Sequence, residues 1–436
     1  MSNLLASYFT NSGNDITNNT STTDIAGRSF FDIISDCKDF NEEQVECIEN
    51  SNLEIWPYPD SVKASNSSFK FAISEPLVDP IRILINKYFG AAEAAKRVLP
   101  NADSVVPDAN GLQILIKCGC FRSVVNLTYK ILSSLPNEEL YTSFSLQIWF
   151  IRISILLKTK FFKEAEMELK QFDNFEKAEF FYQTKQPGQI GTFVPFGLRI
   201  LNAELAHYMG NSNESVSNLY KILSIVKKIL LDLPQDSVAR KVWNERKNKI
   251  LFSISNILIS RKNYSKAMEI LKSIAESEYA DKNAVWSSIG KLYATLGDAL
   301  NASNSFKKAK AFSKENPSNK CRNLLNLSFL KIINHQYKEA FDYLQEADQL
   351  APHNSTILNN MAFCLFYSGN LIEAIKLIES KIHLNPAKYL NESLLFNLCT
   401  LYELESSKAL QKKQNLLFWL NVYAGDGFNE TCLQLQ

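Results

Sequence analysis

Glycine, proline and histidine are scarce in this 436-residue chain, which contains 14 Gly, 13 Pro and 4 His. A β-sandwich with many tight turns, or a nucleotide fold with a glycine-rich loop, uses more Gly and Pro than this. A net positive charge is also missing, since 47 basic residues face 46 acidic ones, and we therefore expect no nucleic-acid partner. With 46% apolar residues, the composition favours a soluble, mostly helical protein with a large core.

Dense cysteine spacing and long apolar runs are absent as well. The eight cysteines are dispersed, unlike those of a small secreted disulfide scaffold, and the close pair Cys118 and Cys120 lacks the further ligands of a zinc site. The first residues resemble no signal peptide, and the most apolar run, from Leu146 to Leu157, is interrupted by Arg152. We therefore expect a cytoplasmic protein with reduced, mostly buried thiols, no metal and no membrane span.

The N-terminal part of the chain has little helical pattern. Residues 1–27 form a polar, low-complexity tail that we expect to be disordered, and 28–78 form an arm with short apolar motifs. These motifs, Phe30 to Ile34 and Leu53 to Pro59, are interpreted either as a loosely packed arm or as docking motifs for a partner. We divide the rest into an irregular helical-repeat region (79–247), repeats of regular period (248–386) and C-terminal capping helices (387–436).

An internal repeat carries most of the information. Alanines recur at 267, 302, 340 and 374, at spacings of 35, 38 and 34 residues, and a large apolar residue follows each one four positions later. A period near 34 with paired helices is typical of tetratricopeptide repeats, in which alanine admits a crossing helix and stacked repeats complete the core. The sequence therefore predicts an all-α tetratricopeptide-repeat solenoid with a disordered N-terminal arm and a C-terminal capping region. The predicted repeat-packing residues are Trp286, Gly290, Tyr293, Ala302, Phe306, Ala309, Ala340, Leu344, Ala374 and Ile378.

Catalytic motifs are missing from the sequence. It has no phosphate-binding glycine loop, no Gly-x-Ser-x-Gly elbow and no His-Glu-x-x-His. The four histidines have no evident partners in the sequence. We therefore expect no catalytic residues, no cofactor and no enzymatic activity.

The first helices of stacked repeats line a groove, which is the candidate interaction site. Its predicted lining is unusually apolar, so we expect either the chain's own C-terminal helix (Leu394 to Leu420) or a partner helix to cover it, and favour the first. Asn256, Arg322 and Asn326 occupy positions like those of a chaperone-type carboxylate clamp, but the basic partners of such a clamp are missing. The predicted groove residues are Arg322, Leu325, Phe329, Ile332, Asn359, Phe363 and Phe366.

Several strings in the chain are more specific than the repeat pattern. They are Tyr88 to Ala95, Leu146 to Phe150, Ala165 to Glu168, Val194 to Phe196, Arg199 to Glu204 and the long string Glu392 to Ser406. On these residues the segment from Pro80 to the C-terminus resembles the trafficking protein particle (TRAPP) complex subunit 12 family, whose members are tetratricopeptide-repeat proteins. Animal members have a much longer N-terminal region, so we do not expect functions of that region to transfer to this chain.

The resemblance implies a non-catalytic scaffold subunit of the TRAPP III complex, a guanine-nucleotide exchange assembly for Rab GTPases. It implies roles in ER-to-Golgi transport, Golgi organisation and autophagy. The implied partners are other TRAPP subunits and, indirectly, a Rab GTPase. Membrane association would be peripheral and through the complex, at the Golgi or the ER–Golgi intermediate compartment. The alternative from the repeat pattern is a free-standing adaptor that binds a peptide or helix of a client protein.

Overall fold

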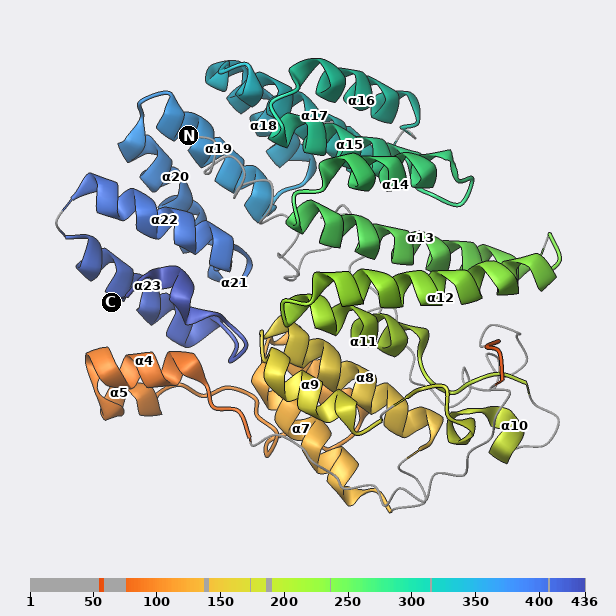
Figure 1. Cartoon of the computed structure of the whole chain (residues 1–436). Helices are drawn as coiled ribbons and strands as arrows, with labels where there is room; N and C mark the ends of the chain where they lie inside the picture. Colours follow the sequence, from red (N-terminus) through yellow and green to blue (C-terminus); the bar gives the residue numbers. More distant parts are fainter. Residues whose placement is uncertain are drawn as a thin grey trace. The chain divides into compact units, whose positions relative to one another are not determined.

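The fold is all-α in the part of the chain that the computed structural model describes (Figure 1). That part comprises residues 55–58, 76–136, 141–172, 174–185, 190–235, 237–313, 316–406 and 408–435. The predicted disordered tail and the motif from Phe30 to Ile34 lie outside these residues. Within them every element is a helix, apart from one isolated antiparallel bridge between Phe181 and Thr192, which confirms the predicted fold class.

The chain divides into two compact units, each made of separate stretches of sequence. We call described residues 79–98 and 271–435 the repeat unit, and described residues 55–58, 76–78 and 99–270 the aromatic unit. Helix α14 (Tyr264–Glu276) contains the division between residues 270 and 271. The five-part division expected from the sequence stays a prediction.

The repeat unit is a series of helical hairpins. Helix α15 packs on α16, α17 on α18, α19 on α20 and α22 on α23. Most first helices begin at an Asp or Asn whose side chain accepts a backbone N–H, as at Asp281, Asn316 and Asn354, and such caps satisfy the unpaired first turn of a helix. The helices are α4 (Pro80–Phe89), α5 (Ala91–Ala95), α15 (Lys282–Thr295), α16 (Ala299–Ala311), α17 (Pro317–Ile333), α18 (Tyr337–Leu350), α19 (Ser355–Tyr367), α20 (Leu371–Leu384), α21 (Pro386–Tyr389), α22 (Glu392–Glu405), α23 (Ala409–Tyr423) and η5 (Glu430–Leu433).

Small residues lie where the helices of this unit cross. Ala302, Ala340 and Ala374 are completely buried on the second helices α16, α18 and α20. A Cβ atom placed on Gly290 of α15 would lie 2.3 Å from the ring of Phe306 on α16, so no larger residue fits there without a shift. Close packing of paired helices thus depends on these side chains being small.

The C-terminal helices are joined to an N-terminal hairpin of the same unit. Helices α4 and α5 precede Arg97, and α4 packs on α23. The Arg97 guanidinium donates hydrogen bonds to three carbonyls at the end of α23, those of Leu420 (3.0 Å), Asn421 (2.6 Å) and Ala424 (2.9 Å). It also pairs with Asp79 at 2.5 Å. Because the last carbonyls of a helix lack intrahelical partners, Arg97 caps α23 from more than 300 residues away.

The predicted C-terminal helix from Leu394 to Leu420 is wrong as a single helix. The structure has two helices there, α22 and α23, because the backbone at Ser406 is extended (φ −161°, ψ 163°). Helix α22 packs against α20 and α19 and so continues the stack. When helical periodicity continues on both sides of a short break, the sequence alone predicts a single helix.

The aromatic unit also contains helical hairpins, but of uneven length. Helix α6 packs on α7, α8 on α9, and α12 on both α11 and α13. Among the helices of the described residues, none is long and apolar enough to cross a membrane. The helices are α6 (Ala109–Lys117), α7 (Phe121–Ser134), α8 (Ser143–Lys158), α9 (Phe162–Lys170), η4 (Ala178–Phe180), α10 (Tyr182–Lys185), α11 (Phe196–Tyr208), α12 (Ser212–Asp232) and α13 (Val238–Ser260).

The charge that interrupts the most apolar run of the sequence is paired inside this unit. Arg152 on α8 and Glu168 on α9 form a two-pronged ion pair, with Nε to Oε2 and Nη2 to Oε1 both at 2.7 Å. Both side chains are 1% exposed, and Arg152 Nη1 also donates to the carbonyl of Val125 at 2.6 Å. The pair joins three helices, because Val125 belongs to α7.

Candidate functional site

The predicted groove residues lie on two first helices of the repeat unit. Arg322, Leu325, Phe329 and Ile332 are on α17, and Asn359, Phe363 and Phe366 are on α19.

Two of the four α17 residues are buried and so cannot contact a ligand. Phe329 and Ile332 are 8% and 6% exposed and belong to a core cluster that Leu325 and Phe363 also contact. Helices of the chain itself therefore cover Phe329 and Ile332, and the groove as a binding site stays a prediction. The reason is geometric: a first helix faces its neighbours over a wide arc, and its 3.6-residue period does not say which side chains point between helices.

Two of the three α19 residues, Asn359 and Phe366, contact the chain's own C-terminal part. Phe366 packs against the core cluster that contains Leu394 and Leu398 of α22. Asn397 Nδ2 of the same helix donates to Asn359 Oδ1 at 2.8 Å. Docking of a partner on the remaining groove surface stays a prediction.

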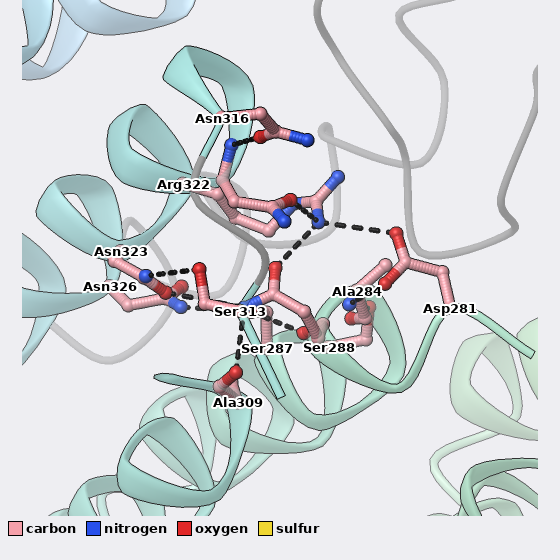
Figure 2. A network of polar contacts seen from close by, with 12 residues as sticks. Asp281, Ala284, Ser287, Ser288, Ala309, Ser313, Asn316, Arg322, Asn323 and Asn326 are labelled. Carbon is pink, nitrogen blue, oxygen red and sulfur yellow. Dashed lines mark hydrogen bonds and ion pairs between the residues drawn. The ribbon is translucent and has the colours of Figure 1, made fainter. Parts of the chain in front are cut away.

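A polar network joins α15 to α17 and is the most developed polar cluster near this surface (Figure 2). Arg322 Nη1 donates to Asn283 Oδ1 at 2.6 Å and to Asn319 Oδ1 at 3.2 Å, and it lies 3.3 Å from Asp281 Oδ2. Asp281 is also the cap of α15, accepting from the backbone N–H of Ala284 at 3.1 Å. The cap therefore fixes the carboxylate at the position where it meets Arg322.

Amide side chains extend the network into the core. Asn283 Nδ2 donates to the carbonyl of Ala309, at the end of α16, at 2.7 Å. Asn326 Nδ2 donates to Ser287 Oγ at 2.8 Å, and Ser287 Oγ donates to the carbonyl of Asn283 at 2.8 Å. Asn323 Nδ2 donates to Ser313 Oγ at 3.1 Å. Figure 2 shows Asn326 pointing toward Ser287, and Asn323 pointing toward Ser313.

Two buried amide atoms of helices α17 and α19 have no hydrogen-bond partner among the residues that the structure describes. They are Oδ1 of Asn326 and Nδ2 of Asn360, which lie at equivalent places 34 residues apart on α17 and α19. Such groups suit a peptide backbone or a water molecule, since one accepts and the other donates. Nothing in this arrangement pairs a nucleophile with a base. In the part of the chain that the structure describes, no three His, Cys, Asp or Glu side chains are grouped to hold a metal ion.

The sequence singled out Arg322 and Asn326 but missed Asn283 and Asn323. Asparagine is common along this chain, so these positions gave no signal of their own. The missed signal was the spacing of three or four residues between Asn319, Asn323 and Asn326, which puts polar side chains on one face of α17.

The predicted repeat-packing residues lie on both helices of the hairpins. Trp286, Gly290 and Tyr293 are on α15, and the others are on α16, α18 and α20. Trp286 and Tyr293 are half-buried, and the ammonium group of Lys308 lies 4.3 Å from the Trp286 ring. The remaining eight are buried, namely Gly290, Ala302, Phe306, Ala309, Ala340, Leu344, Ala374 and Ile378.

One comparison with known protein families agrees with the repeat assignment. A tetratricopeptide-repeat family model matches residues 332–386. Two solved structures are similar in fold, the APC/C hetero-tetramer Cut9–Hcn1 and yeast Tom70. The first is 12% identical, with a TM-score of 0.35, over 76% of this chain and 56% of that one. The second is 14% identical, with a TM-score of 0.34, over 78% and 82%.

The sequence relatives are more informative. Human trafficking protein particle complex subunit 12 is 34% identical over 384 residues, which are 82% of this chain and 52% of the human protein. The mouse protein of the same name is 33% identical over 386 residues, 82% of this chain and 48% of the mouse protein. The chain thus spans about half the length of the curated relatives it matches. These matches confirm the resemblance predicted from the sequence: over four-fifths of its length, this chain is a tetratricopeptide-repeat homologue of the trafficking protein particle complex subunit 12 family.

Proposed function

We propose that this chain is a non-catalytic scaffold subunit of a TRAPP complex of the TRAPP III type. The observation that carries the proposal is the 33–34% identity to trafficking protein particle complex subunit 12 over 82% of the chain. In this role the chain connects other TRAPP subunits to a core that exchanges nucleotide on a Rab GTPase. It thereby serves ER-to-Golgi transport, Golgi organisation and autophagy, at the Golgi or the ER–Golgi intermediate compartment.

The surface of the C-terminal helices supports a scaffold role. Phe396 and Leu404 on α22, and Leu410 and Val422 on α23, are large apolar side chains exposed to solvent. Phe396 and Leu404 lie in the string from Glu392 to Ser406 that carries the family resemblance most strongly. Exposed apolar side chains that gather on neighbouring helices are typical of protein–protein contacts. The near balance of charge leaves shape and apolar contact as the main means of recognition.

Affinity purification of the tagged full chain, followed by mass spectrometry, tests the proposal. We expect TRAPP core subunits to co-purify in constant ratio with the chain. The double variant Phe396→Ser with Leu404→Ser should lose at least one of them. The matched control is Leu231→Ser, which changes an exposed leucine on α12 of the aromatic unit and should keep them all.

The same experiment separates the alternative function, a free-standing adaptor for a peptide or helix of a client. Recovery of a single client or of chaperones alone, with no TRAPP subunit, would overturn the scaffold proposal. The amide-rich network around Arg322 favours the adaptor, since amides and guanidinium groups bind peptide backbones and carboxylates. An Arg322→Ala variant that loses the client would then identify the groove as its site.

A further inference from the structure

A four-residue segment, Ile55 to Tyr58, packs in the aromatic unit. The side chain of Trp56 is 3% exposed. Its indole Nε1 donates a hydrogen bond to Glu176 Oε2 at 2.8 Å, and the Arg199 guanidinium lies 4.3 Å from its ring centre. Its ring also stacks on Trp243, with centroids 6.4 Å apart and planes 30° apart. Trp56 thus meets a hydrogen-bond acceptor, a cation and an aromatic face together.

The walls of this pocket hold one another in place without Trp56. Arg199 Nη1 donates to Glu176 Oε1 at 2.5 Å, so one carboxylate receives both the guanidinium and the indole. Arg199 Nη2 also donates to Thr192 Oγ1 at 3.2 Å. Phe196 meets Trp243 edge to face at 5.9 Å, and the Arg246 guanidinium lies 4.5 Å from the Trp243 ring.

These wall residues come from α11, α13 and the segment between α9 and α11. The contacts among these wall residues do not involve residues 55–58. We therefore expect the pocket to keep its shape when that segment leaves it. Phe196 and Arg199 also belong to two of the strings on which the family resemblance rests.

The neighbours of Trp56 add a second, shallower contact. Tyr58 meets Phe181 edge to face at 5.3 Å and stays 39% exposed. Pro57, which is exposed, fixes its own φ and favours an extended backbone at the residue before it. Ile55 packs at the edge of the core cluster. One deep aromatic anchor with lightly held neighbours is the usual pattern of short peptides bound to proteins.

We infer that the aromatic unit carries a binding site for a short peptide with a tryptophan followed by proline, and that Ile55 to Tyr58 of the same chain occupies it as an internal ligand. The carboxylate of Glu176 selects tryptophan, because phenylalanine and leucine have no N–H to donate. Arg199 selects an aromatic ring through its position over the ring face. Tethering gives the internal segment an effective concentration of about millimolar, so a free peptide competes poorly until the internal tryptophan is removed.

The test uses the full-length chain and a fluorescent peptide with the sequence of residues 51–62, SNLEIWPYPDSV. The peptide should bind the Trp56→Ala chain saturably, and bind the wild-type chain at least about tenfold more weakly. A peptide in which alanine replaces the tryptophan should bind neither chain. Equal binding of the first peptide to both chains, or binding of the control peptide, would overturn the proposal.

Two further variants separate a ligand site from an ordinary core position. Adding Glu176→Gln to Trp56→Ala should weaken peptide binding several-fold, since a charged acceptor makes a hydrogen bond about twice as strong as a neutral one. The matched control is Glu166→Gln on α9, a surface glutamate that pairs with Lys170 and should change nothing.

The folded state of Trp56→Ala is itself decisive, because a ligand must be dispensable for folding. We expect circular dichroism at 20 °C to match the wild type. A chain unfolded by Trp56→Ala would identify Trp56 as a core residue and overturn the proposal. So would a folded Trp56→Ala chain that leaves the peptide unbound. Trp56→Phe, which keeps the ring and loses the indole N–H, should admit the peptide with intermediate affinity.

Discussion

The repeat unit and the aromatic unit pack helical hairpins with different residues. In the repeat unit, completely buried alanines such as Ala302, Ala340 and Ala374 let second helices approach closely. In the aromatic unit, the largest fully buried side chains include Trp149, Trp243 and several phenylalanines. Where successive hairpins have the same geometry, small residues at the helix crossings give close packing. Where the helices differ in length, large aromatic rings fill the spaces between them. Completely buried alanines also occur in the aromatic unit, at Ala165 and Ala267, so the two units differ in their large aromatic side chains rather than in the presence of small ones.

The two units also differ in the polar groups they bury. The repeat unit joins α15 to α17 with neutral amides and a partly exposed Arg322, and it pairs the buried Arg97 with a partly exposed Asp79. The aromatic unit instead buries both members of an ion pair, Arg152 and Glu168. Losing one half of a buried ion pair leaves a charge in the core, while losing an amide leaves a neutral group. We therefore expect the aromatic unit to be more sensitive to polar substitutions, and the repeat unit to changes of volume.

The largest effect is expected from Glu168→Ala. It leaves the buried guanidinium of Arg152 without its carboxylate, which should lower the free energy of unfolding by about 3–5 kcal/mol in urea denaturation. The matched control, Glu166→Ala on the same helix, breaks a surface pair with Lys170 at 2.9 Å and should cost at most about 1 kcal/mol. Equal losses for the two variants would show that the buried pair of Arg152 and Glu168 contributes no more to stability than a surface pair.

Ala340→Trp should produce the next largest effect, and Ala302→Trp a similar one. An indole at a crossing with no free space overpacks it and should lower the free energy of unfolding by about 1–3 kcal/mol or more. Lys338→Trp, an exposed position on the same helix, serves as the control in thermal melting. Wild-type-like melting of Ala340→Trp would show that the assigned repeat register is wrong.

The comparison also explains how far the sequence alone leads. Repeat packing imposes a fixed spacing on small residues, so the alanine period near 34 predicted the fold class and the helices that contain Ala302, Ala340 and Ala374. The direction in which Phe329 and Ile332 point depends on how neighbouring hairpins rotate, and no single-helix pattern records that rotation. Their burial in a core cluster could therefore not be predicted from the sequence.

Contacts between distant parts of the chain could not be predicted from the sequence for another reason. Trp56 meets Glu176 from 120 residues away, and Arg97 meets Leu420 from 323 residues away. Trp56 is a single side chain in a segment without helical periodicity, and Arg97 follows the short helix α5, so only the folded backbone brings each one to its partners. The network around Arg322 is an intermediate case, since its residues repeat along α17 but their partners lie on α15.

A smaller effect should separate two asparagines of that network. Asn283→Ala removes the hydrogen bond that Asn283 donates to the Ala309 carbonyl and the one that it accepts from Arg322. The variant should lower the free energy of unfolding by about 1–2 kcal/mol. Asn326→Leu removes an amide whose Oδ1 has no partner, so we expect a change of less than about 1 kcal/mol. Urea denaturation of both variants ranks them. A greater loss for Asn326→Leu would mean that its oxygen binds a group such as an internal water.

The smallest effect concerns reactivity rather than stability. Burial raises the pKa of the thiols of Cys364 and Cys399, both in the repeat unit, to about 12. At pH 8.5 fewer than about one such thiol in a thousand is the reactive thiolate, whereas Cys118 of the aromatic unit is exposed. Among the six cysteines that the structure describes, iodoacetamide labelling with peptide mapping should therefore modify Cys118 first, and modify Cys364 and Cys399 only after urea is added. Because the raised pKa depends on burial, early labelling of Cys364 in the folded chain would mean that α19 separates from its neighbours, and that the repeat unit is the less rigid of the two.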